Sequence, residues 1–314
     1  MSPMKQTVVI TGASSGIGRA SVMRMSRAGW QVLATVRKDS DRVRLERESS
    51  GNIYPVILDV EDGASVTAAA GEIESQLDTG GLDGLVNVAG IGMVGLVEFA
   101  AMADLRKIFE INFFGQVAII QALCPLLRKS RGRIVNITTV GVNLALPFGA
   151  LLNASKSAFA MVNDSLRMEM HPLGVRVSAI EPGAISTPAV DKTLGDVEQV
   201  IQSLPAEAQA LYGATIRNFA RRGYEMEKNG SSPDVVAKAV HHALTSPRPK
   251  IRYRVGKHAR LLATLPRVLP ERVLDMIRLR LSGLSSLEAP PRPTTKQQRP
   301  SAIVPARPSV VNPN

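Results

Sequence analysis

Short apolar runs alternate along the chain with longer segments in which apolar residues recur at helical spacing. The apolar runs are rich in Val and Ile and occupy residues 7–11, 31–36, 53–58, 84–88, 133–138, 175–180 and 251–255. Runs of this kind are apolar on both sides, as strands of a buried parallel sheet must be. Strands separated by helical segments form βαβ units, so the pattern predicts the α/β class, with one doubly wound parallel sheet.

Residues from about 186 to 232 break this alternation. They are polar and helical in pattern, with Gly and Pro between the helical stretches. A segment inserted before the last helix and strand of an open α/β sheet often covers the ligand crevice. We therefore expect a single domain over residues 1–255, with a lid at about 186–232.

Two further segments follow this domain. Residues 256–284 are rich in Leu, Val and Arg, and a helix starting at Pro270 would place Val273, Leu274, Ile277 and Leu281 on one face. Two compatible interpretations remain: a helix docked over the substrate pocket, or a basic amphipathic element resting on an anionic membrane. Residues 285–314 alternate Pro with Lys and Arg, which predicts a disordered basic tail.

The composition is that of a soluble globular protein. Of the 314 residues, 45% are hydrophobic and 21% are charged, which excludes global disorder. The single cysteine, Cys124, excludes an internal disulfide and suggests a reducing compartment, and the four histidines give no pattern of metal ligands. We expect no signal sequence and no membrane-spanning helix, hence a cytoplasmic protein, with peripheral membrane contact through residues 256–284 as the second interpretation.

The net charge of +11 is concentrated at one end of the chain. From Arg248 onward, Lys and Arg outnumber Asp and Glu by 14 to 3, so the preceding residues are neutral in sum. An enzyme of nucleic acids would spread basic charge over its binding face and interleave it with aromatic residues. We therefore expect no nucleic-acid partner.

The clearest local motif is the octapeptide from Thr11 to Gly18, Thr-Gly-Ala-Ser-Ser-Gly-Ile-Gly. It follows the first predicted strand and opens the first predicted helix, and this context distinguishes a dinucleotide site from an ordinary turn. Glycines let the backbone approach a pyrophosphate, and the helix N-terminus supplies free N–H groups. The motif predicts a Rossmann-like fold in which the pyrophosphate is bound by Gly12, Ser14, Ser15, Gly16, Ile17 and Gly18.

Together with four further motifs, this glycine spacing resembles the short-chain dehydrogenase/reductase family over about residues 5–255. Asn87-Val88-Ala89-Gly90 resembles the family's Asn-Asn-Ala-Gly motif, with Val88 at the second Asn. Asp59-Val60 resembles its adenine-contacting pair, Asn112 matches its helical Asn, and 182–187 matches its Pro-Gly motif. The resemblance implies further cofactor contacts from Asp59, Val60, Asn87, Ala89, Gly90, Pro182, Gly183, Ile185 and Thr187.

The same resemblance implies an activity and an assembly. The pattern is similar to the retinol and hydroxysteroid dehydrogenase branch, which implies an oxidoreductase acting on the carbonyl or alcohol of a small lipophilic substrate. It also implies a homodimer or homotetramer formed through two long helices, at about 103–128 and 151–171.

The end of the second strand bears on the choice of nucleotide. An acidic residue there would accept the ribose 2′-hydroxyl of NAD, whereas cations suit the 2′-phosphate of NADP. The chain has Arg37 and Lys38 at this point, and its first carboxylate is Asp39. We therefore predict NADP(H), bound partly by Arg37 and Lys38. A solvated pair of loop cations, with NAD(H) as the cofactor, is the alternative.

The resemblance also exposes a substitution at the catalytic position. In the family a Tyr exchanges the proton of the substrate oxygen, a Lys four residues later lowers the phenol pKa and holds the nicotinamide ribose, and a Ser thirteen residues before the Tyr binds the substrate oxygen. Here Leu152 stands at the Tyr position, Lys156 at the Lys position and Thr139 at the Ser position, with Asn112 as the fourth catalytic position. Thr139 keeps a hydroxyl, but Leu152 has no proton to exchange.

Other tyrosines offer limited substitutes. Tyr212 and Tyr224 lie in the predicted lid, where ordinary packing is the main expectation and reach into the pocket the alternative. Tyr253 and Lys257 have the right spacing but lie on a predicted strand, so their side chains would not share a helix face. Two function classes therefore remain: an NADP(H)-dependent oxidoreductase with impaired turnover, or a non-catalytic binder of NADP(H) or a lipid.

Overall fold

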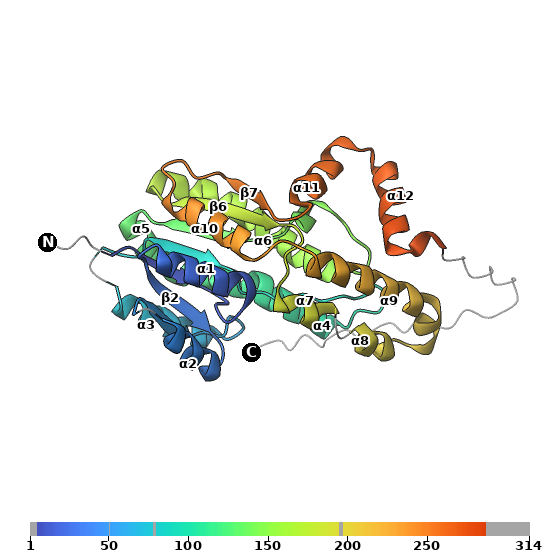
Figure 1. The fold of residues 1–314 in the computed structure, drawn as a ribbon, viewed down its shortest axis with the longest axis horizontal. Helices are drawn as coiled ribbons and strands as arrows, with labels where there is room; N and C mark the ends of the chain where they lie inside the picture. The colour runs from blue at the N-terminus through green and yellow to red at the C-terminus, as the bar shows by residue number, and fades with distance from the viewer. Residues whose placement is uncertain (1–4, 50, 78–79, 195–196, 287–314) are drawn as a thin grey trace, which may run out of the picture.

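Seven parallel strands form one continuous sheet in the computed structural model, which describes residues 5–49, 51–77, 80–194 and 197–286 (Figure 1). The strand order is β3-β2-β1-β4-β5-β6-β7. The strands are β1 (Thr7–Ile10), β2 (Gln31–Val36), β3 (Ile53–Ile57), β4 (Gly84–Asn87), β5 (Arg133–Ile137), β6 (Arg176–Pro182) and β7 (Arg252–Val255). The predicted doubly wound parallel sheet in a single domain is therefore confirmed.

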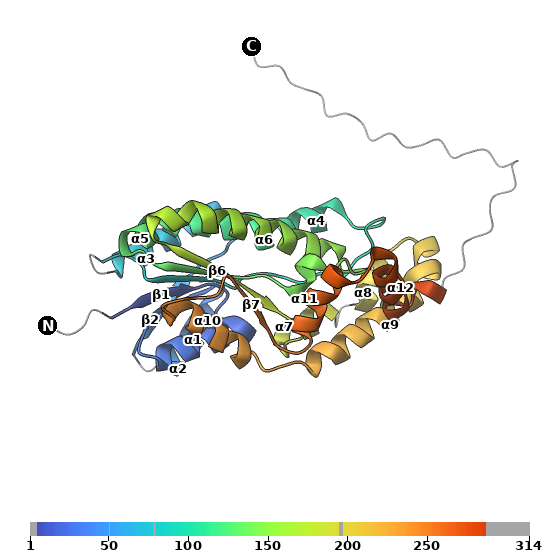
Figure 2. The same cartoon turned by 90° about the horizontal axis from the view of Figure 1, so that it is seen from above.

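Helices cover both faces of this sheet. In Figure 2, α1 and α10 lie on one face, and α3, α5 and α6 lie on the other. The helices are α1 (Gly16–Arg27), α2 (Asp39–Glu48), α3 (Gly63–Ser75), α4 (Met102–Phe109), α5 (Gly115–Ser130), α6 (Ala150–Met170), α7 (Pro188–Leu194), α8 (Val197–Ser203), α9 (Ala206–Lys228), α10 (Asp234–Thr245), α11 (Ala259–Val268) and α12 (Glu271–Ser282). Four short helical turns, η1 (Glu110–Phe114), η2 (Val140–Asn143), η3 (His171–Leu173) and η4 (Leu284–Ser286), complete the chain.

The core consists of two apolar layers divided by the sheet. Successive side chains of a strand point to opposite faces, so Val8 and Ile10 of β1 pack with the α1 and α10 side while Val9 packs with the α3 and α5 side. All three side chains are fully buried. Strands buried on both faces explain the unbroken apolar runs of the sequence.

The sheet reverses its winding between β1 and β4. β1 pairs with β2 on one side and with β4 on the other, although β4 follows β3 in the chain. At such a point the connections leave in opposite directions, which opens a crevice at the carboxyl ends of the strands. The residues that follow β1 and β4 therefore face each other.

Residues 186–232, which we expected to form a lid, contain α7, α8 and the long α9. Side chains of α8 and α9 form a third apolar cluster with the segment after β4 and with the turn before α6. The buried members are Val94, Phe148, Ile201, Leu204, Ala208 and Ile216. This cluster joins the inserted helices to the carboxyl-terminal edge of the sheet.

The segment after β7 forms two helices, whereas we expected one helix from Pro270. Pro270 is the residue before α12, whose first residue is Glu271, and a separate helix, α11, precedes it. Leu274 is buried, but Leu281 is 60% exposed, so the predicted apolar face is only partly covered. Arg222 of α9 donates a hydrogen bond to the carbonyl of Leu281 at 3.1 Å, which ties α12 to α9. Of the predicted tail, residues 287–314 lie outside the part of the chain that the structure describes, and the first two residues belong to η4.

One helical stretch, residues 102–130, is long and apolar enough to cross a membrane by length and composition. Our expectation of no such stretch was therefore too strict. Half of its most apolar window is buried inside the fold, and its buried residues belong to the core beside α3 and the sheet. A core helix of a soluble domain passes the same test, so this stretch is weak support for a membrane span.

Candidate functional site

The glycine motif forms a tight turn between β1 and α1. Gly12 has φ of +64°, and a Cβ atom there would lie 3.0 Å from the backbone of Ala89. A Cβ on Gly18 would lie 2.1 Å from the carbonyl oxygen of Gly12. Both positions therefore require glycine, because any side chain would collide with backbone. α1 begins without a side-chain cap at Ser15, which leaves its first-turn N–H groups facing the crevice.

The segment after β4 is held against this turn by Thr11. The Thr11 hydroxyl accepts hydrogen bonds from the backbone N–H of Val88 at 2.9 Å and of Ala89 at 3.1 Å. The structure thus brings the predicted residues of 12–18 together with Asn87, Ala89 and Gly90. Ser14, Gly16 and Ile17 are half-buried, while Ser15 is exposed at the mouth of the turn.

Asn87 starts a chain of buried amides below the crevice. Its Nδ2 donates to Oδ1 of Asn136 at 2.8 Å, and Nδ2 of Asn136 donates to Oδ1 of Asn163 at 3.0 Å. Within the described residues, Oδ1 of Asn87 is buried and has no hydrogen-bond partner. A buried acceptor without a partner is costly, so this oxygen suits a donor supplied by a ligand.

The residues predicted at the adenosine end follow β2 and β3. Asp59 is half-buried and accepts a hydrogen bond from the Glu61 amide at 3.1 Å, and Val60 is buried. Arg37 and Lys38 are both exposed at the end of β2. The first carboxylate after them, Asp39, lies 3.1 Å from the Arg42 guanidinium and is therefore engaged.

A third cation, which the sequence did not indicate, reaches the same place. Arg44 of α2 donates a hydrogen bond to the carbonyl oxygen of Ser14 at 2.6 Å and pairs with Asp41 at 2.8 Å. Its guanidinium therefore lies against the glycine turn. The end of β2 and the start of α2 together form a basic rim of this turn.

Asn112 lies in a π-helical turn, η1, between α4 and α5. Its Oδ1 accepts from the Ile91 amide at 2.8 Å, and its Nδ2 donates to the Ile91 carbonyl at 3.0 Å and to Oγ of Ser155 at 3.1 Å. Single π turns inside α-helices are rare and occur mostly at functional sites. These bonds fix the chain after Gly90 against α6.

Lys156 on α6 is buried beside this Asn. Its Nζ donates to the Ile137 carbonyl at 3.1 Å, and its burial lowers the pKa of the ammonium to about 8. A Cβ on Gly90 would lie 3.0 Å from Oδ1 of Asn112 and 3.2 Å from Nζ of Lys156. The structure therefore brings Gly90, Asn112 and Lys156 to one point at the carboxyl ends of β4 and β5.

Thr139 and Leu152 flank this point. Thr139 precedes η2, and its Oγ1 accepts from the Gly141 amide at 3.1 Å. Leu152 is half-buried on α6, one helical turn before Lys156, and its carbonyl accepts from Oγ of Ser155 at 2.9 Å. The Leu152 side chain is a hydrocarbon, so of these two side chains only that of Thr139 can form a hydrogen bond with a ligand.

The loop after β6 carries the remaining predicted contacts, Pro182, Gly183, Ile185 and Thr187. Its Gly183 and Ala184 amides donate to the carbonyls of Val255 at 2.9 Å and Lys257 at 3.1 Å, and its Ser186 amide to that of Ser231 at 3.0 Å. The Ile185 amide alone in this run donates to a side chain, Oε2 of Glu227 on α9, at 2.9 Å. A Cβ on Gly16 would lie 3.2 Å from Cβ of Thr187, so this loop meets the glycine turn.

The alternative tyrosines are engaged elsewhere. Tyr212 packs edge-on against Phe99 with ring centroids 6.4 Å apart, and the Tyr224 hydroxyl donates to Asp191 at 2.9 Å. Tyr253 lies on β7 as predicted, where its hydroxyl is 2.8 Å from Nδ1 of His242. The predicted lid packing of Tyr212 and Tyr224 therefore agrees with the structure.

A buried ion network lies behind the site. Glu181 of β6 is fully buried and binds Arg252 at 2.5 Å and Arg254 at 3.1 Å, and Arg252 also pairs with Asp164 of α6. Asp164 accepts from Asn163 at 3.4 Å, which connects the ions to the amides that begin at Asn87. The charges balance, as a buried network requires.

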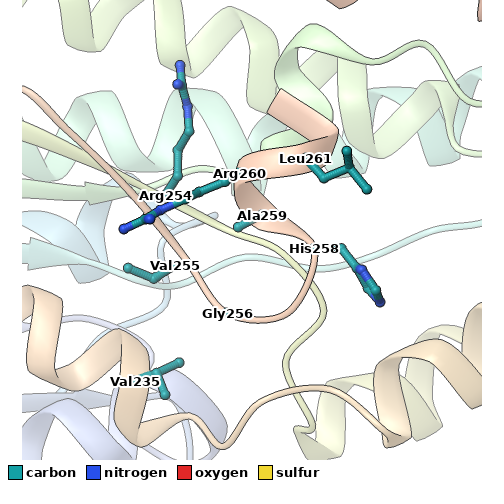
Figure 3. A pocket seen from close by; sticks show the side chains of 8 residues that line it. All are labelled: Val235, Arg254, Val255, Gly256, His258, Ala259, Arg260 and Leu261. Atoms are coloured by element: carbon teal, nitrogen blue, oxygen red, sulfur yellow. The ribbon is translucent and has the colours of Figure 1, made fainter. Parts of the chain in front are cut away.

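An open depression of about 420 Å³ lies along the edge strand β7, away from the point where β1 and β4 meet. Figure 3 shows the turn between β7 and α11 on one side and Val235 of α10 on the other. The lining residues are Val235, Arg254, Val255, Gly256, His258, Ala259, Arg260 and Leu261. Within the described part of the chain, no group of three or more His, Cys, Asp or Glu side chains could hold a metal ion.

The fold and the glycine turn define a dinucleotide-binding α/β protein. The sequence model of the family described as "short chain dehydrogenase" matches residues 6–198. Retinol dehydrogenase 5 of Homo sapiens is 34% identical over 278 residues, covering 86% of each chain, and 17-beta-hydroxysteroid dehydrogenase type 6 of Rattus norvegicus is 32% identical over 277 residues, again 86% of each. The chain belongs to the short-chain dehydrogenase/reductase family of oxidoreductases.

A solved structure agrees with this assignment over nearly the whole fold. A short-chain dehydrogenase from Streptomyces avermitilis superimposes with a TM-score of 0.67 at 27% identity, covering 90% of this chain and 97% of that chain. The family resemblance inferred from the glycine turn and the four further motifs is therefore confirmed.

Proposed function

We propose that this protein is an NADP(H)-dependent oxidoreductase that acts on the carbonyl or alcohol of a lipophilic substrate, with turnover limited by Leu152. One observation carries the proposal. The glycine turn after β1 and the cluster of Gly90, Asn112 and Lys156 meet at the carboxyl ends of adjacent strands, where open α/β sheets bind their ligands.

The residues around the crevice fit a nicotinamide nucleotide. The turn has no room for a Cβ atom at Gly12 or Gly18, so its backbone can lie close to a ligand. The uncapped start of α1 offers N–H groups to a pyrophosphate. The unpartnered Oδ1 of Asn87 offers a hydrogen-bond acceptor to a donor group of the nucleotide. When bound, the nicotinamide supplies or accepts the hydride. The residues that would hold the nucleotide are Gly12, Ser14, Ser15, Gly16, Ile17, Gly18, Arg37, Lys38, Asp59, Val60, Asn87, Ala89, Gly90, Lys156, Pro182, Gly183, Ile185 and Thr187.

The roles of the catalytic positions follow from their side chains. Lys156 donates to a ribose hydroxyl and is itself positioned by the Ile137 carbonyl. Asn112 orients the Ile91 backbone and Ser155, and Thr139 offers a hydroxyl to the substrate oxygen. Leu152 stands where the family has its Tyr and exchanges no proton. Loss of a positioned acid or base costs about 10²–10⁴ in rate, and we propose a penalty of this size here.

We propose NADP(H) over NAD(H) because the end of β2 is basic. Arg37 and Lys38 are exposed, and Arg44 lies against the glycine turn. A 2′-phosphate would bind these cations by charge-assisted hydrogen bonds. Asp39, the first carboxylate after the strand, is paired with Arg42, which partly offsets its charge beside these cations.

A lipophilic substrate is supported by the apolar surroundings of the site. The third apolar cluster brings Phe148 within 5.2 Å of Phe219 of α9, measured between ring centroids, and includes Val94 after β4. The names of two relatives refer to retinol and to a hydroxysteroid, which are both apolar alcohols. We propose that residues 186–232 act as a lid that places this apolar wall over the substrate.

A second candidate is a non-catalytic binder of NADP(H) or of a lipid. The observation that favours it is the hydrocarbon at Leu152, together with the engagement of Tyr212 and Tyr224 in other contacts. The two candidates differ in turnover. A binder of NADP(H) would share the nucleotide affinity of the oxidoreductase, whereas a binder of a lipid would not.

Two surfaces support the proposed partners. Phe114, Met161 and Met168 are 54%, 69% and 60% exposed on the helical layer of α5 and α6, which supports a homodimer or homotetramer through this layer. At the other end of the molecule (Figure 1), α11 and α12 expose Leu261 and Leu281 among arginines, which supports peripheral contact with an anionic membrane. In this proposal the protein is located mainly in the cytoplasm.

Calorimetric titration with NADPH tests the proposed nucleotide binding. Gly12→Ala places a methyl group against Ala89 and forces a side chain into positive φ, so we expect at least a tenfold weaker Kd. Gly71→Ala on α3 makes the same chemical change where no atom lies within 4 Å, and its Kd should equal that of the wild type. An absence of NADPH binding by the wild-type protein would contradict the proposal.

A further inference from the structure

Glu227 makes an unusual contact with the loop after β6. Four consecutive amides of this loop, from Gly183 to Ser186, all donate hydrogen bonds, and three of them bind backbone carbonyls that belong to the fold. The fourth, the Ile185 amide, binds the Glu227 carboxylate at 2.9 Å. A side chain can rotate away without breaking the backbone pairing, so the Ile185 N–H is the one donor of this run that a ligand can take over.

The Ile185 N–H lies in a loop that borders the proposed nucleotide site. Thr187, two residues further on, meets Gly16 of the glycine turn, so the loop and the pyrophosphate-binding turn close on each other. Ile185 belongs to the segment 182–187 that matches the family's Pro-Gly motif, whose backbone holds the nicotinamide carboxamide, so in the proposed function Ile185 contacts the nicotinamide end of the nucleotide. A carboxamide oxygen of the nicotinamide and the Glu227 carboxylate would therefore require the same N–H group.

The remainder of α9 keeps Glu227 close to the loop. The Ser231 amide donates to the Ala184 carbonyl at 3.0 Å, and Gly230 approaches Ala184 so closely that a Cβ would lie 2.6 Å from its carbonyl carbon. Lys228 and Tyr224, on either side of Glu227 in the sequence, both bind Asp191 of α7. The carboxylate is thus held next to the amide by a well-anchored helix end, and it is half-buried, which also raises the pKa of Glu227.

We propose that Glu227 occupies the hydrogen-bonding position of the nicotinamide carboxamide and thereby sets the affinity for the nicotinamide half of the nucleotide. The inference rests on the proposed function. A bound nicotinamide displaces the carboxylate from Ile185, whereas the adenosine half of the nucleotide binds without disturbing it. Glu227 is in this sense a specificity-determining residue supplied by the inserted helices, which discriminates between intact nucleotides and fragments.

The test compares NADPH with 2′-phospho-ADP-ribose, which lacks the nicotinamide, in calorimetric titrations. Glu227→Ala removes the competitor, so we expect NADPH to bind about tenfold more tightly, equivalent to about 1.4 kcal/mol, with no change for the fragment. Glu227→Gln keeps a neutral acceptor, which is weaker than a carboxylate, and should give an intermediate gain. Glu225→Ala, on the same helix, removes an exposed carboxylate that pairs with Arg221, and should change neither affinity.

The alternative role of Glu227 is a brace for the loop, and it gives the opposite result. If Glu227 only stabilised the loop, its removal would weaken NADPH binding or leave it unchanged, and either result overturns the proposal. A wild-type protein that binds neither ligand contradicts the proposed function instead, so the two failures are distinguishable.

A measurement on the wild-type chain applies even if the variants do not fold. Carbon-13 NMR of the Glu227 side-chain carboxyl reports directly on the group that would be displaced. We expect NADPH to shift this resonance, because the carboxylate leaves the Ile185 amide, and 2′-phospho-ADP-ribose to leave it unchanged. The same response to both ligands overturns the proposal.

Discussion

Nζ of Lys156 donates a hydrogen bond to the carbonyl oxygen of Ile137 at 3.1 Å, across the gap between α6 and the end of β5. The contact satisfies one N–H of an amine that is otherwise removed from water, and the burial lowers its pKa to about 8. The amine is therefore poised between its two protonation states near neutral pH. It lies beside Gly90 and Asn112, at the centre of the proposed site.

This burial predicts how stability depends on pH. Lys156 titrates at about 8 when folded and near its usual 10.5 when unfolded. Between these values the unfolded chain binds the extra proton, so the free energy of unfolding rises with pH across this window. The gain is on the order of 3 kcal/mol at most. Below pH 8 the folded chain bears the full cost of burying the ammonium.

Urea unfolding of the wild type and of Lys156→Met between pH 7 and pH 10.5 checks this. Met keeps the length of the chain without a titratable group, so the difference between the two proteins isolates Lys156. The wild type should gain stability relative to the variant as pH rises. A difference that stays constant, or one that changes in the opposite direction, contradicts the assignment of a depressed pKa.

The basic rim after β2 predicts selectivity for NADP(H). Replacing Arg37 and Lys38 together by Ala removes two charge-assisted partners of the 2′-phosphate. Because hydrogen bonds to charged groups contribute about 1.5–3 kcal/mol each, we expect the Kd for NADPH to rise at least tenfold. The Kd for NADH should stay the same, since NADH has a 2′-hydroxyl.

The control for this experiment is Arg47→Ala, which removes an exposed cation from the last turn of the same helix, α2. It should leave the preference for NADPH unchanged. Equal weakening of NADPH and NADH by the double variant would show that Arg37 and Lys38 do not recognise the 2′-phosphate.

The ion network at β6 and β7 predicts a large effect on stability. Arg252 pairs with both Glu181 and Asp164, and Glu181 is fully buried. Arg252→Ala removes one of the two guanidinium partners of the buried Glu181, and a hydrogen bond to a charged group contributes about 1.5–3 kcal/mol. Arg221→Ala on α9 removes an exposed pair with Glu225, in which the side chains are 63% and 60% exposed, and should cost less than about 1 kcal/mol. Urea unfolding of both variants measures the contrast, and equal costs would contradict the importance of the network.

The exposed face of α11 and α12 predicts membrane binding. Leu261 and Leu281 are 57% and 60% exposed, and we expect Leu261→Ser with Leu281→Ser to reduce sedimentation with vesicles of phosphatidylcholine and phosphatidylserine. Ile57→Ser, on the opposite edge strand β3, is the matched control and should have no effect. Equal sedimentation of the double variant and the wild type would exclude this face as the contact.

Local and periodic features of the fold could be predicted from the sequence. The strands are apolar on both faces, and the glycines of the turn fall within one short segment, so both left clear patterns. The contact that excludes a side chain at Gly18 is local, with Gly12, whereas that at Gly12 is with the distant Ala89. The start of α12 beside Pro270 was predicted, but the preceding helix α11 was missed. Pro266 lies inside α11, and a proline ordinarily interrupts a helical pattern. The π turn at Asn112 leaves no pattern in hydropathy.

Features that depend on distant pairs could not be predicted. Arg44 lies 30 residues from Ser14, and Glu227 lies 42 residues from Ile185, so each is an ordinary surface charge when the sequence alone is considered. Asn136 and Asn163 interrupt apolar segments, which indicates a buried polar role but not a partner. Ser155 precedes Lys156 directly, yet its bond to Asn112 depends on the packing of η1 against α6.

Introducing a phenol at position 152 tests the central claim most directly. Steady-state oxidation of NADPH with a panel of apolar ketones compares the wild type with Leu152→Tyr, and with Leu152→Phe as the control for ring size. We predict that all three bind NADPH equally and that only Leu152→Tyr gains turnover, by about 10²–10⁴-fold. Brisk turnover by the wild type, with no gain in Leu152→Tyr, would contradict the account.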